Sequence, residues 1–318
     1  MPACNETNIG HATFLLEGIP GLEAVGPWIS VLFCFTYLMA ILGNGLILFV
    51  IKTRKSLHQP MYLFLCMLCV TDLGLSASTL PTVLSVFLFN TRELGFDLCL
   101  AQLFFIHTFS NIESAVLLAM AFDRFVAIRH PLRYASILTS ARIGNIGLAT
   151  IIRASGLHIP LILLLKRLPY NQIQPLSYSY CLHPDVMKVA CADTTPNSYY
   201  GLFLVLSTLG LDSVLIVLSY VMILNTVLSL TSWRERLKAL NTCISHICVT
   251  LLFYIPLLSL TMIHRFRKNA FPLSQILSTY LHLIFPPVLN PIVYSIKTKE
   301  IRKQIMKVFQ DYSTKRFQ

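Results

Sequence analysis

The chain has 318 residues, of which 55% are hydrophobic and only 12% are charged, and its mean hydropathy is +0.67. A soluble protein carries about twice that charged fraction, so the composition excludes an ordinary soluble enzyme or binding domain. The formal net charge of +11 does not indicate a nucleic-acid partner, because the sequence contains no soluble domain whose basic face could bind one.

Seven apolar stretches follow one another along the chain. Each has roughly the 20 residues that a helix needs to cross the hydrocarbon core of a bilayer, and all are too long to be barrel strands. We therefore predict an all-α membrane protein, a seven-transmembrane helix bundle, with helices over Pro27–Ile51, Pro60–Phe87, Cys99–Ile128, Ile143–Leu165, Tyr200–Leu230, Asn241–His264 and Leu273–Ile296.

The distribution of Lys and Arg sets the orientation of this bundle. With the N-terminus outside, the inner loops and tail hold more than twice as many Lys and Arg residues as the outer segments, as the positive-inside rule requires. The predicted organisation is an extracellular segment (residues 1–26), a membrane domain (27–296) and a cytoplasmic tail (297–318). Asn5 begins the only clear N-glycosylation sequon, which falls on the predicted outer side.

The tail contains a second kind of pattern. Over Lys299–Gln310, apolar residues recur at helical spacing beside four basic residues. This pattern predicts a short amphipathic helix on the anionic inner leaflet of the bilayer. The alternative is a solvated basic tail.

Two carboxyl groups lie in the middle of predicted spans, Asp72 in the second and Glu113 in the third. Ionisable residues inside a membrane are functional candidates. In one interpretation each carboxyl is protonated or hydrogen-bonded between helices. In the other, the two carboxyls share one sodium ion, because two close carboxylates cannot both stay ionised without a counter-charge.

The third span ends in an adjacent acid–base pair, Asp123–Arg124, within the run Met120–Phe125. Unpaired charges are costly in a low dielectric, so we interpret the pair as an ionic latch that Arg124 leaves for another partner in a second state. The alternative is a charged anchor at a helix end. In the seventh span, Pro291 breaks the helical hydrogen-bond ladder and offers a hinge.

Near the predicted outer end of the bundle lie His107, Thr261 and Arg265. Thr261 and Arg265 are spaced i, i+4 and therefore share one face of the sixth helix. If that face lines a cavity, Arg265 presents a guanidinium fork to a carboxylate, with Thr261 and His107 donating hydrogen bonds. The alternative is that Arg265 extends to the outer headgroups of the bilayer.

Four cysteines fall on the predicted outer side, where surroundings are oxidising: Cys4, Cys99, Cys181 and Cys191. Cys99 opens the third helix, and Cys181 lies midway in the long loop before the fifth. A bridge there would close this loop over the mouth of the bundle, although spacing alone does not decide which cysteines pair.

Several runs, in this order, resemble the signature runs of rhodopsin-like G-protein-coupled receptors, and more narrowly of olfactory receptors. These runs are Gly43-Asn44, Pro60–Tyr62, Met120–Phe125, Lys238–Cys243 and Pro291–Tyr294. Three further runs are similar to the fish-like (class I) branch of that family: His58–Pro60, Thr71–Leu75 and His264–Phe266.

The resemblance implies a plasma-membrane odorant receptor, not an enzyme, that binds a small carboxylic acid and activates the olfactory stimulatory G protein to raise cyclic AMP. No cofactor is implied beyond the sodium ion considered above. The acid-binding positions of the family fall on His107, Thr261 and Arg265. The remaining implied positions are the pocket wall at His158, Gly201 and Val205, a Cys99–Cys181 bridge, and a G-protein switch at Asp123, Arg124, Asn290, Pro291 and Tyr294.

The chain departs from the family pattern at several positions. Phe125 replaces the usual Tyr after the Asp-Arg pair, and Arg129 stands where Cys is typical. The family's second loop bridge would join Cys191 to position 171, which is Asn171 here. Cys191 is therefore expected either to be an unpaired thiol or to pair with Cys4.

Three other functions are alternatives to this one. A secondary transporter also carries intramembrane carboxylates, but the sequence has no inverted halves or matched broken helices. A membrane enzyme needs a facing nucleophile and base, or metal ligands, which the sequence does not offer. A non-olfactory receptor for metabolic acids or steroids remains open.

Overall fold

The computed structural model describes residues 12–18, 26–229, 231–266 and 272–316. Within these ranges it does not describe the side chains of residues 26–27, 238, 242, 263–266, 272–277, 309 and 311–316. The account below concerns the described part of the chain.

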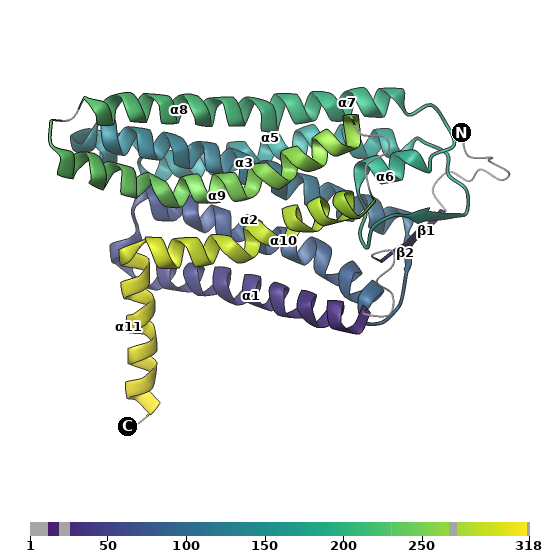
Figure 1. Ribbon diagram of the computed structural model, residues 1–318, viewed down its shortest axis with the longest axis horizontal. Helices are drawn as coiled ribbons and strands as arrows, with labels where there is room; N and C mark the ends of the chain where they lie inside the picture. The colour runs from purple at the N-terminus through teal and green to yellow at the C-terminus, as the bar shows by residue number, and fades with distance from the viewer. Residues whose placement is uncertain (1–11, 19–25, 230, 267–271, 317–318) are drawn as a thin grey trace.

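Seven long helical segments run roughly parallel to the long axis of the molecule (Figure 1). They are α1 (Gly26–Thr53), α2 (Pro60–Phe87), α3 (Phe96–Arg129), α5 (Ser140–Lys166), the continuous run of α7 (Thr195–Val205), η4 (Leu206–Gly210) and α8 (Leu211–Leu228), α9 (Trp233–Phe266) and α10 (Pro272–Lys297). Within the described residues, six of these segments are long and apolar enough to cross a membrane, and α10 completes the bundle. The predicted seven-helix architecture is confirmed.

Short elements connect the long helices. Those near the inner ends of the helices are η2 (Lys55–Leu57), η3 (Pro131–Arg133) and α4 (Tyr134–Ile137), and α6 (His183–Lys188) lies in the long outer loop. After α10, α11 (Lys299–Arg316) turns away from the bundle axis (Figure 1). The predicted C-terminal amphipathic helix is therefore present, and it continues six residues beyond the predicted end.

Helix α3 lies at the centre of the bundle, where it packs against α2, α5, α8 and α9. Its buried residues include polar and ionisable side chains from Gln102 to Arg124. The outward faces of the outer helices carry exposed Leu, Ile, Val and Phe side chains, as on α1 and α8. Because lipid tails are as apolar as these side chains, such exposure is expected of a protein dissolved in a bilayer.

A three-stranded sheet, which the sequence analysis did not predict, covers the outer end of the bundle. Its strand order is β2 (Glu93–Gly95), β1 (Thr13–Leu16), β3 (Ile173–Leu176), with β1 antiparallel to β2 and parallel to β3. Phe14 of β1 is fully buried and contacts the rings of Phe96 and Tyr170. Apolar packing thus holds the N-terminal segment against two outer loops.

The sixth helix begins earlier than predicted. Hydrophobicity placed its start at Asn241, whereas α9 begins at Trp233 and includes charged residues such as Arg234 and Glu235. A helix can continue beyond the bilayer into water, where polar side chains cost nothing, so the apolar stretch marks only the part within lipid. The single helix α9 consequently joins the outer end of the bundle to its inner surface.

Helices α1 and α10 make a close approach at Gly43. A Cβ atom placed at Gly43 would lie 2.9 Å from Cγ and 3.0 Å from Cβ of Pro291. The proline ring is fixed to its backbone and cannot rotate away. A Cβ atom placed at Gly45, two residues further along α1, would meet nothing within 4 Å.

We therefore predict that Gly43→Ala lowers the stability of the receptor by about 1–3 kcal/mol, because it overpacks the α1–α10 contact. Gly45→Ala is the matched control, and it should leave stability unchanged or slightly raised, because Ala favours a helix more than Gly does. The apparent melting temperature of detergent-solubilised protein measures both. Equal melting temperatures for the two variants would contradict this prediction, because they would show that α10 can move away from α1 at Pro291 at little cost.

Candidate functional site

A cavity of about 340 Å³ lies in the outer half of the bundle. Its walls come from α3, α5, the α7–η4 run, α9, α10 and the outer loop that contains α6. Five of the six predicted ligand-binding residues line it: His107, His158, Gly201, Val205 and Thr261. The side chain of the sixth, Arg265, lies outside the described residues, although its backbone belongs to α9, one turn beyond Thr261.

The described residues that line the cavity include four histidines but no Asp, Glu, Lys or Arg. Apolar side chains of α5, α7 and α9 form much of the wall, including Leu161, Leu204, Leu257 and Leu260. The cavity therefore suits a small, mostly apolar molecule that a few polar contacts orient.

Three histidines meet at the outer part of the cavity. The rings of His107 and His158 stack in parallel with centroids 5.8 Å apart, and His183 stands edge-on to His107 at 6.4 Å. The Nδ1 atom of His158 lies 2.7 Å from the carbonyl oxygen of Ala154. Because a carbonyl only accepts, Nδ1 carries the proton, and in the neutral ring Nε2 is left as an acceptor.

Gly201 makes room for one of these rings. A Cβ atom placed at Gly201 would lie 3.2 Å from Cε1 of His183, closer than an ordinary van der Waals contact. Gly201 was predicted to line the wall, whereas His183 was not. The available signal was its position two residues after Cys181, in a loop that a bridge would hold over the mouth of the bundle.

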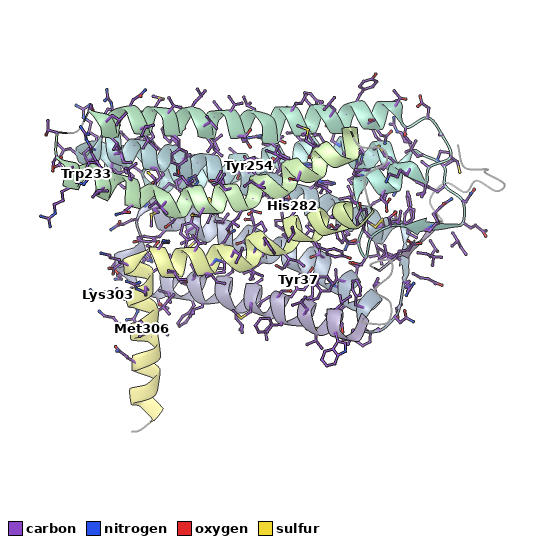
Figure 2. All side chains as sticks on the ribbon, viewed as in Figure 1. Tyr37, Trp233, Tyr254, His282, Lys303 and Met306 are labelled. Carbon is purple, nitrogen blue, oxygen red and sulfur yellow. A yellow bond between two sulfur atoms is a disulfide. The ribbon has the colours of Figure 1, made fainter. Side chains whose placement is uncertain are left out.

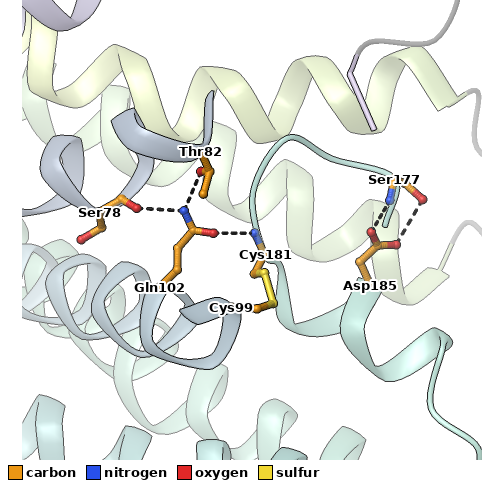
Figure 3. The surroundings of a disulfide bond; sticks show 7 residues. All are labelled: Ser78, Thr82, Cys99, Gln102, Ser177, Cys181 and Asp185. Carbon is orange, nitrogen blue, oxygen red and sulfur yellow. Dashed lines mark hydrogen bonds between the residues drawn. A yellow bond between two sulfur atoms is a disulfide. The ribbon is translucent and has the colours of Figure 1, made fainter. Parts of the chain in front are cut away.

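The outer loop is fixed to α3 by the predicted disulfide, because Cys99 and Cys181 are bonded. Beside it, the amide of Gln102 donates to the carbonyl oxygen of Ser78 at 2.8 Å and to Oγ1 of Thr82 at 2.7 Å (Figure 3). Its amide oxygen accepts the backbone N–H of Cys181 at 2.9 Å. The prediction of this bridge is confirmed, and the loop closes the cavity from above.

Tyrosines of the same loop fill the space beside α1, α2 and α10. Tyr178 and Tyr180 are buried, and the ring of Tyr180 lies 6.0 Å from that of Tyr280. The hydroxyl of Tyr280 shares a short hydrogen bond with Ser179. Burial raises the pKa of the Tyr180 hydroxyl well above its ordinary value, and the neighbouring tyrosines raise it further. The loop thereby separates the cavity from α1 and α2, which contribute none of its described lining residues.

Below the cavity, an ion pair within the membrane joins four helices. Both guanidinium nitrogens Nη1 and Nη2 of Arg153 (α5) lie 3.0 Å from Oδ1 of Asp212 (α8). Ser114 (α3) donates to Oδ2 of Asp212 at 2.9 Å. Since Ser114 has one hydroxyl proton, the hydroxyl of Tyr254 (α9), 2.7 Å away, donates to Ser114.

This network was missed in the sequence analysis. Its signal was present, because Arg153 and Asp212 are ionisable residues in the middle of the predicted fourth and fifth spans. Nothing local in the sequence indicates that they pair, since they lie 59 residues apart.

Asp72 and Asn290 are in contact between α2 and α10. The amide of Asn290 donates to both carboxyl oxygens of Asp72, at 3.2 and 3.0 Å. Glu113 is also fully buried, and neither of its carboxyl oxygens has a hydrogen-bond partner among the described residues. The amide oxygen of Asn290 and the hydroxyl of Ser76 are buried and unpartnered as well.

At the inner end of α3, Arg124 contacts Asp123 through two guanidinium nitrogens, with Nε 3.0 Å from Oδ2. The hydroxyl of Tyr134, in α4, donates to the other carboxyl oxygen at 2.7 Å. Burial, followed by the charge of Asp123, raises the pKa of Tyr134, so it stays a neutral donor. Tyr294 lies nearby, with its hydroxyl 3.9 Å from Sδ of Met120.

A second contact ties the inner half of α9 to its neighbours. His246 Nε2 lies 2.9 Å from the carbonyl oxygen of Leu117 on α3, so Nε2 carries a proton. Its Nδ1 therefore accepts the hydroxyl of Tyr220 on α8 at 2.6 Å when the ring is neutral.

Besides the Arg265 side chain, two sequence predictions fall outside the described part of the chain, namely the glycosylation site at Asn5 and the role of Cys4. Cys191 is disulfide-bonded. The alternative in which Cys191 is an unpaired thiol is therefore wrong, and replacement of the usual cysteine by Asn171 does not leave its sulfur free.

Comparisons with known proteins agree with the motifs. The family model described as an olfactory receptor matches residues 33–312. The chain is 58% identical to Olfactory receptor 51G2 of Homo sapiens over 96% of this chain and 97% of that protein. It is 53% identical to Olfactory receptor 51L1 of Homo sapiens over 96% of this chain and 97% of that protein. It is 50% identical to Olfactory receptor 51E2 of Mus musculus over 98% of this chain and 96% of that protein.

The ion pair within the membrane leads to a stability prediction. Arg153→Met should destabilise the protein by about 3–5 kcal/mol, because it leaves the buried Asp212 carboxylate without its counter-charge. The double variant Arg153→Met/Asp212→Leu should recover part of that loss, since it removes both charges.

Lys166→Met is the control, because it breaks the exposed Lys166–Asp97 pair, and exposed pairs contribute little. Melting temperatures of the purified variants test the comparison. A double variant no more stable than Arg153→Met would contradict the electrostatic explanation.

Proposed function

The chain belongs to the olfactory receptor family, and we propose that the ligand of this receptor is a small molecule bearing a carboxylate. As a member of that family it is an odorant receptor of the G-protein-coupled type, a multi-pass protein of the plasma membrane, and not an enzyme. Coupling to the olfactory stimulatory G protein, with a rise in cyclic AMP, is part of the proposal.

One observation carries the choice of a carboxylate. Thr261 lines the cavity together with His107 and His158, and α9 continues without interruption to Arg265. Residues spaced i, i+4 share a helix face, so Arg265 belongs to the same face as Thr261, one turn nearer the mouth. A guanidinium binds a carboxylate through two parallel hydrogen bonds, and such bonds are stronger than neutral ones.

The apolar wall supports a small amphiphilic acid over a larger ligand. An alkyl chain would lie against Leu161, Leu204 and Leu257, while the closed outer loop limits the length available. A cavity of about 340 Å³ is at the lower end of the range for small-molecule sites. A metabolic acid also combines a carboxylate with a small apolar part. A receptor for metabolic acids is therefore the second candidate function.

Activation would use α9 as its moving part. A ligand shifts an equilibrium only by its differential affinity for the two states, and drawing Arg265 inward onto a carboxylate supplies such a difference. The same helix carries Tyr254, bonded to Ser114, and His246, bonded to the carbonyl of Leu117. Outward movement of the inner end of α9 would break the contact of His246 with α3.

The final step concerns the latch. Asp123 holds Arg124 and is itself held by Tyr134, so two donors now satisfy this carboxylate. In the active state Arg124 would leave Asp123 and contact the G protein, with Asn290, Pro291 and Tyr294 adjusting the inner part of α10. Tyr134 would remain to stabilise the charge that Asp123 retains.

The anchor is tested by replacing its guanidinium. We expect Arg265→Ala to weaken responses to straight-chain carboxylic acids by about 10- to 100-fold, since a hydrogen bond to a charged group contributes roughly 1.5–3 kcal/mol. Half-maximal concentrations in a cyclic AMP assay, at matched surface expression, give the measurement. Lys268→Ala removes a cation three positions away and should leave potency unchanged. Equal potency in Arg265→Ala and the parent receptor would refute the anchor.

We also propose that Asp72 and Glu113 hold a sodium ion. The fit rests on their surroundings, where Glu113 offers two unpartnered carboxyl oxygens and Asn290 and Ser76 each offer one more oxygen. Hard monovalent cations bind such oxygen donors, and a cation would offset two buried carboxylates. Its charge would hold α2, α3 and α10 together in one of the two receptor states.

A bound ion stabilises the state that binds it, so sodium chloride should raise the melting temperature of the receptor relative to choline chloride at equal concentration. Glu113→Gln and Asp72→Asn should each abolish that difference. Glu300→Gln, which alters a carboxyl on α11, is the control and should retain it. An identical melting temperature of the parent receptor in both salts would remove the sodium site.

A further inference from the structure

Three buried polar atoms that line the cavity have no hydrogen-bond partner among the described residues. They are Oδ1 of Asn111 on α3, Nδ1 of His282 on α10 and the hydroxyl oxygen of Tyr180 in the outer loop. All three residues are nearly inaccessible, with exposed fractions of 3%, 6% and 1%. Buried polar groups in folded proteins normally have a hydrogen-bond partner, so three such atoms without one around a single cavity require an explanation.

The three residues come from elements that contact one another around the cavity. Ser110, the residue before Asn111, has its hydroxyl 3.4 Å from Nε2 of His282, which joins α3 to α10 at mid-bundle. Tyr180 packs in one apolar cluster with Ile106, one turn above Ser110, and with Leu283, the neighbour of His282. Figure 2 shows His282 on α10 in the middle of the bundle, next to α9 with Tyr254. The wall formed by Tyr180, Asn111 and His282 is called the α3–α10 wall below.

The chemistry of the α3–α10 wall selects the group that would satisfy it. Oδ1 of Asn111 accepts, so its partner must donate a hydrogen. When Ser110 donates to Nε2, Nδ1 of His282 carries the ring proton and needs an acceptor. The hydroxyl of Tyr180 both donates and accepts. A ligand group that donates and accepts at one atom, as an alcohol hydroxyl does, complements this set.

Charged groups fit less well. A second carboxylate would face Oδ1 of Asn111 as acceptor against acceptor, and the described residues that line the cavity include no Lys or Arg to compensate it. An ammonium would find no Asp or Glu in that lining. A carbonyl group accepts but cannot donate to Asn111. A neutral hydroxyl is therefore preferred over each of these.

We propose that the α3–α10 wall is a second polar subsite, which binds a hydroxyl group at the end of the ligand away from its carboxylate. The inference rests on the proposed function, because the carboxylate end is placed at Arg265. The preferred ligand class is then a hydroxy acid rather than a simple alkanoic acid. A ligand with a methyl group at this end would leave all three polar atoms unpaired, which is how a polar site rejects an apolar analogue.

The test compares matched acids in cells that express the receptor. Straight-chain acids from butanoic to decanoic are measured against the ω-hydroxy acid of the same chain length. At the best-fitting length we expect the hydroxy acid to be about three- to tenfold more potent, the range of a net neutral hydrogen bond. Asn111→Ala and Tyr180→Phe should each reduce that ratio toward one.

Two further variants separate the possible causes. Asn197→Ala is the matched control, because Asn197 is a buried amide with an unpartnered nitrogen that does not line the cavity, and it should keep the preference. Arg265→Ala should weaken both acids of a pair equally and leave their ratio unchanged. All responses are normalised to receptor at the cell surface.

The outcomes distinguish the subsite from the anchor. Alkanoic acids at least as potent as the hydroxy acids at every length would overturn the subsite and leave the carboxylate proposal standing, as expected if ordered water satisfies the wall. If no acid activates the receptor, the carboxylate proposal fails. In that case, activation by 1-alkanols that is abolished by Asn111→Ala would still support the hydroxyl subsite. If 1-alkanols also fail to activate the receptor, both the subsite and the carboxylate proposal are overturned.

Discussion

The whole arrangement depends on the cost of an unpaired charge in low dielectric. Inside a bundle surrounded by lipid, a buried ionised or polar side chain gains stability from a partner on another helix or at a helix end. Asp212 meets Arg153, Asp72 meets Asn290, and Asp123 meets Arg124 and Tyr134. Because each partner has a defined geometry, the first two contacts fix the rotation of neighbouring helices about their axes. Apolar packing against lipid could not do this, since lipid tails and leucine side chains are equally apolar.

These pairs also lie at different depths of the bundle, between the cavity and the inner ends of the helices. The cavity lies above the Arg153–Asp212 network, and the latch lies at the inner ends of the helices. Helix α9 passes both, contributing Thr261 to the cavity, Tyr254 to the network and His246 to a contact with α3. The contacts of Tyr254 and His246 therefore oppose a displacement of the outer end of α9. If they rearrange, the position of α9 at the inner surface would change.

The loop between α5 and α7 determines what the cavity can bind. The Cys99–Cys181 bridge and the hydrogen bonds of Gln102 hold it to α3, and Tyr178 and Tyr180 fill the space beside α10. Below it, one wall carries His107 and His158 and the other carries Asn111 and His282. The two proposals above would have a ligand in this cavity bound at both ends, its carboxylate by Arg265 and its hydroxyl by the neutral polar groups of the α3–α10 wall.

The sequence alone determined the membrane class, the seven helices, the orientation and the family, because hydrophobic length, charge asymmetry and short motifs are local properties of a chain. It also named five of the residues that line the cavity, through resemblance to the family. Only the tertiary structure decided that Arg153 pairs with Asp212, that His183 and His282 line the cavity, and that β1 joins the outer loops. Each of these depends on contacts between segments far apart in the chain, which helix rotation and loop closure create and no local pattern encodes.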